Sequence, residues 1–420
     1  MKRYDSYKDS GVKWIGEIPS HWKVKKIKYI FEERSEKGFP NEPVLCSTQK
    51  YGVIPQSMYE NRVVVVNKGL DGLKLVRKGD FVISLRSFQG GIEYAHYQGI
   101  ISAAYTILAL NMGINADYMK YLLKSYDFIQ LLQTCVTGIR EGQNINYALL
   151  RKNYIALPSL AEQRAIVSFL DTELGEIDTY MDKEQQLIER LKELKQSLIA
   201  RAVTHGIDPK VKMKPSGIDW IGEIPEHWEV KRLSQVAKEY FISNKDIHHQ
   251  NLLSLSYGKI IRKDITTTKG LLPSSFDNYQ VVKNGVIVLR LTDLQNDHRS
   301  LRVGLAREEG IVTSAYLSII CRNNITSEYL YEQLHCNDIH KVFYGMGDGL
   351  RQSLNWDGLR NLLIALPPLS EQHAIVDYLQ DKTSKIDKLI SEKTRELEYM
   401  KELRQRIISD AVTGKIDVRS

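Results

Sequence analysis

Two short segments in opposite halves of the chain each place an arginine, a hydroxyl side chain and a glutamine directly after an apolar run. The residues are Arg86, Ser87 and Gln89 in the first segment, and Arg290, Thr292 and Gln295 in the second. Arginine pairs with guanine and glutamine with adenine through two hydrogen bonds each, so such loops could read base edges in DNA. A surface turn whose arginine extends into solvent is the alternative. The same three side-chain types in both halves favour DNA contact.

Glycine-rich and polar turns supply further candidates for the same chemistry. Residues 137–150 match residues 346–359 in position and contribute Arg140, Gln143, Asn144, Asn146, Arg351, Gln352 and Asn355. Two earlier turns contribute Lys50, Tyr51, Tyr257, Lys259 and Arg262. Asparagine and glycine are also ordinary turn residues, so a structural role for the glycine-rich segments stays open.

The segments that must position these residues occur twice. Residues 10–27 and 216–233 are identical at 12 of 18 positions, and residues 155–178 and 364–387 at 13 of 24. Four of the five tryptophans lie in the two W-I-G-E-I-P-x-H-W copies, which we interpret as packing clasps rather than as ligand sites at His21 or His227. In a duplicated protein, like segments are expected to form a shared scaffold and unlike segments to face different targets.

A long amphipathic helix is predicted at 160–205, and a second helix of similar pattern begins at residue 369. Its apolar residues recur at steps of three and four, which is typical of a coiled coil. An antiparallel pairing in which residue numbers sum to 566 matches acid with base and apolar with apolar. The predicted pairs are Glu173 with Lys393, Glu184 with Lys382, Ile177 with Leu389, Leu187 with Leu379, Leu191 with Ile375 and Ile166 with Met400. The alternative is two helices that each pack on their own domain.

Each middle segment combines strand-like apolar runs with one helix, at 117–132 or 327–342. The predicted fold class is therefore α+β: two tandem mixed α/β domains separated by two long helices that form an intramolecular antiparallel coiled coil, with a pseudo-twofold internal repeat. The expected boundaries are 1–158 for the first mixed domain, 159–208 for the central helix, 209–367 for the second mixed domain and 368–420 for the C-terminal helix.

Composition and missing motifs narrow the function. The net charge of +7 permits a nucleic-acid partner without requiring one. The four cysteines lack a C-x-x-C pair, and no apolar run approaches the length of a membrane helix, so we expect a soluble, cytoplasmic protein. The sequence lacks a P-loop, an Asn/Asp-Pro-Pro-Tyr/Phe tetrapeptide, a nucleophile elbow and metal-ligand spacing among its histidines. We therefore expect catalysis to reside on other chains.

Together these features resemble the specificity subunit of type I restriction-modification systems. The resemblance rests on the two W-I-G-E-I-P-x-H-W segments, the two I-A-L-P-x-L-x-E-Q junctions and the two long helices that end in A-V-T. It implies that the mixed domains are target-recognition domains, each reading one half of a bipartite, asymmetric DNA site. It also implies that the coiled coil sets the spacer, and that the chain is a non-catalytic part of a defence against foreign DNA.

The resemblance also implies partners and cofactors. Two modification subunits, which methylate adenine with S-adenosylmethionine, would dock on the helices and their flanks, and restriction subunits would add cleavage that depends on ATP and Mg2+. Candidate docking residues are Glu162, Gln163, Glu371 and Gln372. No cofactor or metal is expected on this chain.

Two alternatives come from other classes of protein. One is an autonomous DNA nuclease or methyltransferase with a cryptic site, which turnover by the isolated chain would reveal. The other is a protein-binding scaffold, which would lack the salt-dependent DNA affinity that phosphate contacts produce.

Overall fold

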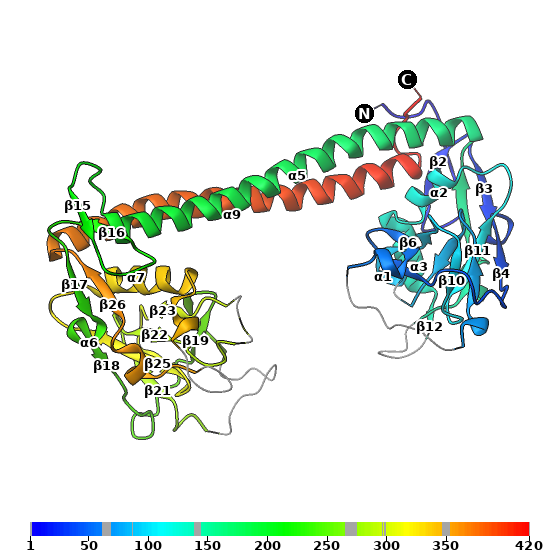
Figure 1. Cartoon of the computed structure of the whole chain (residues 1–420). Helices are drawn as coiled ribbons and strands as arrows, with labels where there is room; N and C mark the ends of the chain where they lie inside the picture. Colours follow the sequence, from blue (N-terminus) through cyan, green and yellow to red (C-terminus); the bar gives the residue numbers. More distant parts are fainter. Residues whose placement is uncertain are drawn as a thin grey trace. The chain divides into compact units, whose positions relative to one another are not determined.

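A computed structural model of the chain describes residues 2–60, 69–85, 87–137, 144–264, 275–295, 297, 300–346 and 353–419. The chain divides into two compact units (Figure 1). Unit 1 comprises Met1–Gln185 together with Thr394–Ser420, and unit 2 comprises Gln186–Lys393. Each unit therefore contains one mixed α/β domain and a part of both long helices, α5 (Leu160–His205) and α9 (Leu369–Val412).

A four-stranded antiparallel sheet lies at the centre of each domain. In unit 1 its strand order is β4 (Phe31–Arg34), β11 (Thr106–Leu110), β8 (Phe81–Ile83) and β9 (Glu93–Tyr94). In unit 2 its strand order is β18 (Ala237–Glu239), β25 (Leu317–Cys321), β22 (Ile287–Leu289) and β23 (Val303–Leu305). The two orders are equivalent, so the repeat seen in the sequence is a repeat of topology.

Paired strands and short helices complete each domain. Unit 1 adds β1 (Tyr7–Asp9) with β2 (Glu17–Pro19), β3 (Lys23–Lys26) with β14 (Tyr154–Leu157), β5 (Leu45–Thr48) with β6 (Gly52–Pro55), β7 (Lys74–Val76) with β10 (Gly99–Ile101), β12 (Val136–Thr137) with β13 (Asn144–Ile145), and helices α1 (Ser87–Gly90), α2 (Ala116–Leu122), α3 (Tyr126–Thr134) and α4 (Tyr147–Leu150). Unit 2 adds β15 (Met213–Pro215) with β16 (Glu223–Pro225), β17 (Glu229–Arg232) with β26 (Leu363–Leu366), β19 (Leu253–Ser256) with β20 (Lys259–Arg262), β21 (Gln280–Val282) with β24 (Gly310–Val312), and helices α6 (Leu233–Val236), α7 (Ser327–Ile339) and α8 (Trp356–Leu359). Single turns of 3₁₀ helix are η1 (Ile27–Tyr29), η2 (Gln56–Met58), η3 (Leu70–Gly72) and η5 (Val342–Gly345).

One predicted helix proves to be two. The helix expected at 117–132 breaks into α2 and α3 at Ser125, whose hydroxyl accepts a hydrogen bond from the Phe128 amide. A serine at this position caps a new helix by satisfying a free backbone donor, which explains the break.

The central strands are buried on both faces. Phe81 and Ile83 of β8 belong to the main core of unit 1, whereas Val82 belongs to a smaller core formed with β5, β6, β7 and β10. The residues of β22 divide between two cores of unit 2 in the same way. Successive side chains of a strand face opposite sides, so a strand covered on both faces requires an unbroken apolar run.

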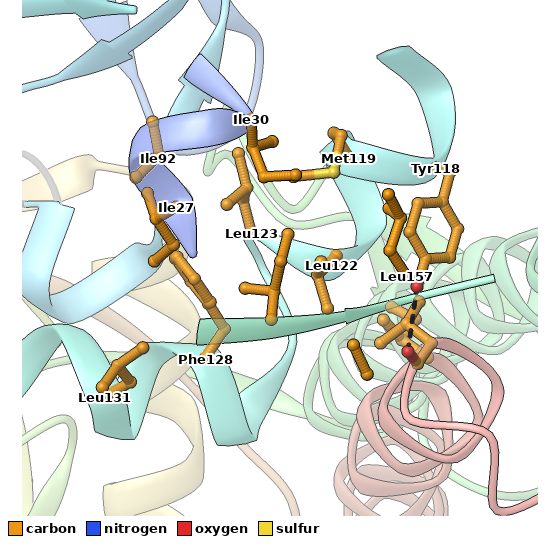
Figure 2. Close-up of a cluster of buried hydrophobic side chains, with 14 of the residues drawn as sticks. Ile27, Ile30, Ile92, Tyr118, Met119, Leu122, Leu123, Phe128, Leu131 and Leu157 are labelled. Carbon is orange, nitrogen blue, oxygen red and sulfur yellow. Dashed lines mark hydrogen bonds between the residues drawn. The ribbon is translucent and has the colours of Figure 1, made fainter. Parts of the chain in front are cut away.

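The C-terminal end of each long helix docks on the helix that follows the sheet. In unit 1 the Tyr118 hydroxyl of α2 donates a hydrogen bond to the Val412 carbonyl of α9, at 3.1 Å, beside the main core (Figure 2). In unit 2 the Tyr329 hydroxyl of α7 lies 3.3 Å from the Val203 carbonyl of α5. Burial raises the pKa of both tyrosines, so both remain neutral donors. The A-V-T segments, residues 202–204 and 411–413, are buried at these contacts, which accounts for their repetition.

The N-terminal end of each long helix is fastened by its Glu-Gln pair. Glu162 accepts a hydrogen bond from the indole of Trp22 at 2.9 Å and lies 3.0 Å from the imidazole of His21. Glu371 lies 2.7 Å from the imidazole of His227. Trp22 and its counterpart in unit 2 are fully buried, which confirms the packing role predicted for the tryptophan-rich segments.

The adjacent glutamines are also held inside the fold. The Gln163 side chain bonds to two backbone groups of unit 1, and the Gln372 side chain bonds to three backbone groups of unit 2. Glu162, Gln163 and Gln372 are buried, so the expectation that these residues dock a partner is wrong. Their polar atoms already have partners within the domain. Glu371 is half-buried and takes part in the same junction.

Parts of the two long helices pack antiparallel within each unit. In unit 1, Arg404 pairs with Asp178 at 2.9 Å, and the Tyr180 hydroxyl donates to Glu396. In unit 2, Lys195 of α5 pairs with an aspartate of α9 at 2.7 Å. Among the described residues, neither these helices nor any other is long and apolar enough to cross a membrane.

The predicted register of this pairing is wrong in both units. The contacting residue numbers sum to 576–582 rather than 566, a displacement of ten to sixteen residues. The predicted pairs Leu187 with Leu379, Leu191 with Ile375 and Ile166 with Met400 therefore do not form. The pairs Glu173 with Lys393, Glu184 with Lys382 and Ile177 with Leu389 each join the two units and stay predictions.

The predicted seam of α5 and its buried seam diverge at two adjacent apolar residues. Leu187 is 39% exposed, whereas Ile188 is 3% exposed. From Ile177, steps of four, three and four lead through residues 181 and 184 to Ile188, so the buried seam includes Glu184 and leaves Leu187 outside. Leu389, expected on the seam of α9, is 45% exposed.

Replacing Gln163 with alanine should destabilise unit 1, because a buried amide and a buried carbonyl each lose a partner. The expected loss in the free energy of unfolding is roughly 1–3 kcal/mol, measured by urea unfolding. Gln186→Ala, at an exposed position on the same helix, is the matched control. Equal stability of the two variants would contradict the fastening role.

Candidate nucleic-acid interface

Two segments singled out in the sequence meet in the unit 2 domain, and a third lies close to the start of β23. The Leu354 amide, just before α8, donates a hydrogen bond to the Leu291 carbonyl, just after β22, at 2.9 Å. In the turn between β19 and β20, a Cβ on Gly258 would lie 3.3 Å from Leu301. The β22 loop, defined here as residues 290–295 and 297, is thus bonded to the segment before α8, while the turn between β19 and β20 lies beside Leu301, close to the start of β23.

The matching segments also meet in unit 1. Helix α1, which contains Gln89, lies against β13, which contains Asn144. Gln89 lines a cavity of about 980 Å³ together with Lys50 and Tyr51 of the turn between β5 and β6. The unit 1 cavity thus joins two of the segments that the sequence proposed for DNA contact.

An ion pair with a buried carboxylate lines this cavity, and so does a lysine that lies beside an aromatic ring. Glu93 is 2% exposed and lies 2.7 Å from the Lys124 ammonium, while the Lys120 ammonium lies 4.0 Å from the centroid of the Tyr94 ring. Burial raises the pKa of Glu93 to about 7, and Lys124 opposes that shift. Burial, followed by the two lysines, lowers the pKa of His96. A cation beside an aromatic ring suits a nucleic-acid ligand, although Lys120 also pairs with Asp117 at 2.7 Å, so the lysines of this cavity are matched by acids.

Several of the predicted residues are accessible. The exposed candidates are Lys50, Tyr51, Gln89, Tyr257, Lys259, Arg262, Thr292, Gln295 and Asn355, and the half-buried ones are Asn144, Asn146 and Arg290. The Lys50 ammonium lies 4.8 Å from the centroid of the Tyr51 ring. Tyr257 is 82% exposed at the tip of a turn, with a left-handed backbone (φ +46°). Arg290 pairs with Asp297 at 3.2 Å.

Other predicted residues have structural roles instead. Ser87 is 2% exposed, and its hydroxyl accepts a hydrogen bond from the Ser84 amide, which stabilises the turn before α1. Asn146 and Asn355 cap α4 and α8, each accepting from the backbone amide three residues ahead, at 3.3 and 3.1 Å. The two asparagines thus have the structural role that the sequence left open, and their contact with DNA stays a prediction.

Arg262 is also engaged within its own domain. Its guanidinium bonds to both carboxylate oxygens of Glu308, with the shortest contact at 2.5 Å, although its side chain is 73% exposed. Arg86, Arg140, Gln143, Arg351 and Gln352 lie outside the described residues, and their assignment to DNA contact stays a prediction.

The residues that lie beneath these loops were not among the candidates predicted from the sequence. Arg302 is fully buried under the β22 loop, and the buried Glu93, paired with the half-buried Lys124, lies close to α1. A signal was present for Arg302, since it stands between Leu301 and Val303 at the start of an apolar strand. An arginine inside an apolar run is seldom buried without several acceptors.

The geometry is that of a duplicated α/β protein in which polar segments that are distant in the sequence lie close together within each domain. The model of the type I restriction modification DNA specificity domain matches residues 19–191 and 225–399. The chain belongs to this family, and each of its two halves carries one copy of the domain.

Similar proteins span nearly the whole chain. The type I restriction enzyme MjaVIII specificity subunit of Methanocaldococcus jannaschii is 25% identical, covering 97% of this chain and 92% of its own length. The EcoBI specificity subunit of Escherichia coli is 22% identical, covering 83% and 81%.

Solved structures share the fold at lower identity. A chain from a structure concerning complex assembly and conformational transition of the type I R-M system has a TM-score of 0.68 and 16% identity, covering 95% of this chain and 99% of that one. The HsdS subunit from Thermoanaerobacter tengcongensis has a TM-score of 0.50 and 17% identity, covering 95% and 98%.

The buried Glu93 predicts a pH dependence of stability. Its pKa in the folded state, about 7, exceeds its ordinary value of 4.5, so its contribution to stability is complete below about pH 4.5 and disappears as pH rises through 7. Glu93→Gln should remove a decrease of roughly 1–3 kcal/mol in unfolding free energy between pH 5 and 8. Chemical unfolding at several pH values measures this effect. Parallel curves for the variant and the natural protein would contradict it.

Proposed function

We propose that this chain is the DNA-recognition subunit of a type I restriction-modification complex and reads a bipartite, asymmetric DNA site. Each α/β domain reads one half-site through the loops at the edge of its sheet. Methylation and cleavage are carried out by modification and restriction subunits, which hold S-adenosylmethionine, ATP and Mg2+. The chain itself is non-catalytic and works in the cytoplasm.

One observation carries this proposal. The specificity-domain model matches both halves, and the two halves have equivalent sheets but different residues in the loops at the sheet edge. A scaffold repeated with different loops presents two different surfaces, as an asymmetric site requires. The accessible candidates include arginine, glutamine, threonine, lysine and tyrosine, which suit base edges, phosphates and stacking.

Docking of two modification subunits accompanies this function. The Glu-Gln pairs are used inside the fold, so we assign docking to the exposed faces of α5 and α9, which are rich in charged residues. The same helices, paired antiparallel, set the spacer between the half-sites.

The decisive experiment is a genome-wide map of methylated adenine in cells with and without the gene for this chain. We expect methylation at one interrupted motif to disappear on deletion. Methylation by the isolated chain would instead indicate an autonomous enzyme, and the absence of salt-dependent DNA binding by the assembled complex would indicate a protein scaffold.

Substitutions in one domain should affect one half-site. Gln89→Ala in unit 1 and Gln295→Ala in unit 2 should each relax base choice in a different half by about 1–3 kcal/mol per lost base contact, because each loop reads its own half. Competition binding with sites altered in one half at a time measures this. Gln186→Ala is the control, and equal weakening on all sequences would indicate phosphate contacts.

Lengthening both long helices should change the spacer alone. Seven residues inserted after Gln185 and after Lys393 add about 10 Å of helix, equivalent to roughly 3 base pairs along a parallel duplex. We expect the methylated motif to keep both half-sequences and gain spacer. An unchanged spacer would show that the helices do not set it, and insertion into α5 alone, which disturbs the pairing, is the control.

A further inference from the structure

We propose that Arg302 is a positioning residue that holds the β22 loop in the shape with which unit 2 reads its half-site. The inference rests on the proposed function and names a determinant of specificity that does not itself touch DNA. Arg302 is fully buried, directly before β23.

The Arg302 guanidinium binds the backbone of the loop at four places. It donates hydrogen bonds to the carbonyls of Arg290, Thr292, Asp293 and Asp297 at 3.0, 2.8, 3.2 and 2.5 Å. A guanidinium carries five N–H donors in a rigid plane, so four carbonyls that face one such group are fixed in direction as well as distance. Asp293 has a left-handed backbone (φ +57°), a conformation that needs such support in a residue other than glycine.

Two neighbouring groups hold Arg302 itself. The Tyr344 hydroxyl of η5 accepts a hydrogen bond from the Arg302 Nε and donates one to the Asp297 carbonyl, both at 3.1 Å. The backbone amide of Arg302 donates to the Asp338 carboxylate of α7 at 2.5 Å. The loop is thus tied through Arg302 to α7 and η5.

Stability alone does not account for a charge at this position. Burying a guanidinium costs free energy that apolar packing would avoid, and apolar replacements of buried ions are often neutral or stabilising. What the arginine adds is a defined loop shape. The side chains that this shape presents to solvent are those of Thr292 and Gln295, with Arg290 half-buried beside them.

In unit 1 the segment that corresponds to the β22 loop is held by different contacts. Phe81 pairs with Tyr94 in unit 1 as Ile287 pairs with Leu305 in unit 2. Arg302 precedes Leu305 by three residues, so its counterpart in unit 1 is Gly91, three residues before Tyr94. There the chain forms the short helix α1, whose own turn joins the Gly91 amide to the Ser87 carbonyl at 2.9 Å. Loss of Arg302 should therefore affect one half-site and spare the other.

The test uses Arg302→Lys in the full chain, assembled with modification subunits, on DNA libraries in which one half-site at a time is randomised. Lysine keeps the charge but cannot bind four carbonyls from one plane. We expect discrimination in one half to fall by about tenfold or more, as for a displaced bidentate contact, with the other half and the spacer unchanged. Arg307→Ala, at an exposed arginine paired with Glu328, is the matched control and should retain both halves.

A second variant and a structural measurement separate loop shape from folding. Tyr344→Phe removes only the hydroxyl and should relax the same half-site less strongly. Hydrogen exchange should show faster exchange in the β22 loop, with amides of β22 and β25 still protected. Full discrimination in both variants, or equal loss in both halves, would overturn the inference. If the natural protein directs no sequence-specific methylation, the proposed function falls as well, whereas a specific natural protein with unaffected variants overturns only the role of Arg302.

Discussion

The structure depends on satisfying buried polar groups where the ends of the long helices meet the α/β domains. In unit 1 the start of α5 is fastened by Glu162 against Trp22, and the end of α9 by its Val412 carbonyl against Tyr118. In unit 2, Glu371 at the start of α9 lies against His227, and the Val203 carbonyl at the end of α5 lies against Tyr329. Leaving such a group without a partner costs about 1–3 kcal/mol, so these positions tolerate little change. This constraint explains why the two halves remain alike in short segments that are far apart in the sequence.

The two units are free to differ in sequence and structure where the chain leaves the central sheet. After β8 and after β22 the backbone must satisfy its polar groups before it returns as the next strand, and the two units do so by different means. Unit 1 forms a helical turn supported by the Ser87 hydroxyl, and unit 2 forms a longer loop supported by the Arg302 guanidinium. Since the support lies under each loop, the side chains above it can differ without disturbing the sheet.

The duplication, the α/β character and the long helices follow from repeats and periodicity, which are local properties of the sequence. The register of the helices does not, because Leu187 and Ile188 both fit steps of three and four and only the partner helix distinguishes them. Roles of polar residues were also ambiguous. In a sequence, Glu162, Gln163 and Asn146 resemble surface residues. In the structure Glu162 accepts a hydrogen bond from a buried indole, Gln163 donates one to a backbone carbonyl, and Asn146 caps a helix. Arg302 was missed because its acceptors are carbonyls, which every residue possesses.

In each unit the helical segment after the sheet connects the scaffold to the loops. In unit 2, Tyr329 of α7 binds the end of α5, while Tyr331, two residues on, binds the Gly258 carbonyl. Residues two apart lie on nearly opposite sides of a helix, so one rigid element contacts both. In unit 1, Tyr118 of α2 binds α9, and Lys124, just past its end, binds the Gln49 carbonyl. Because this helical segment is bound to the long helix, it fixes the orientation of any loop that is bound to it. A loop of different sequence therefore stays aligned with the scaffold as long as it keeps its bond to the helical segment.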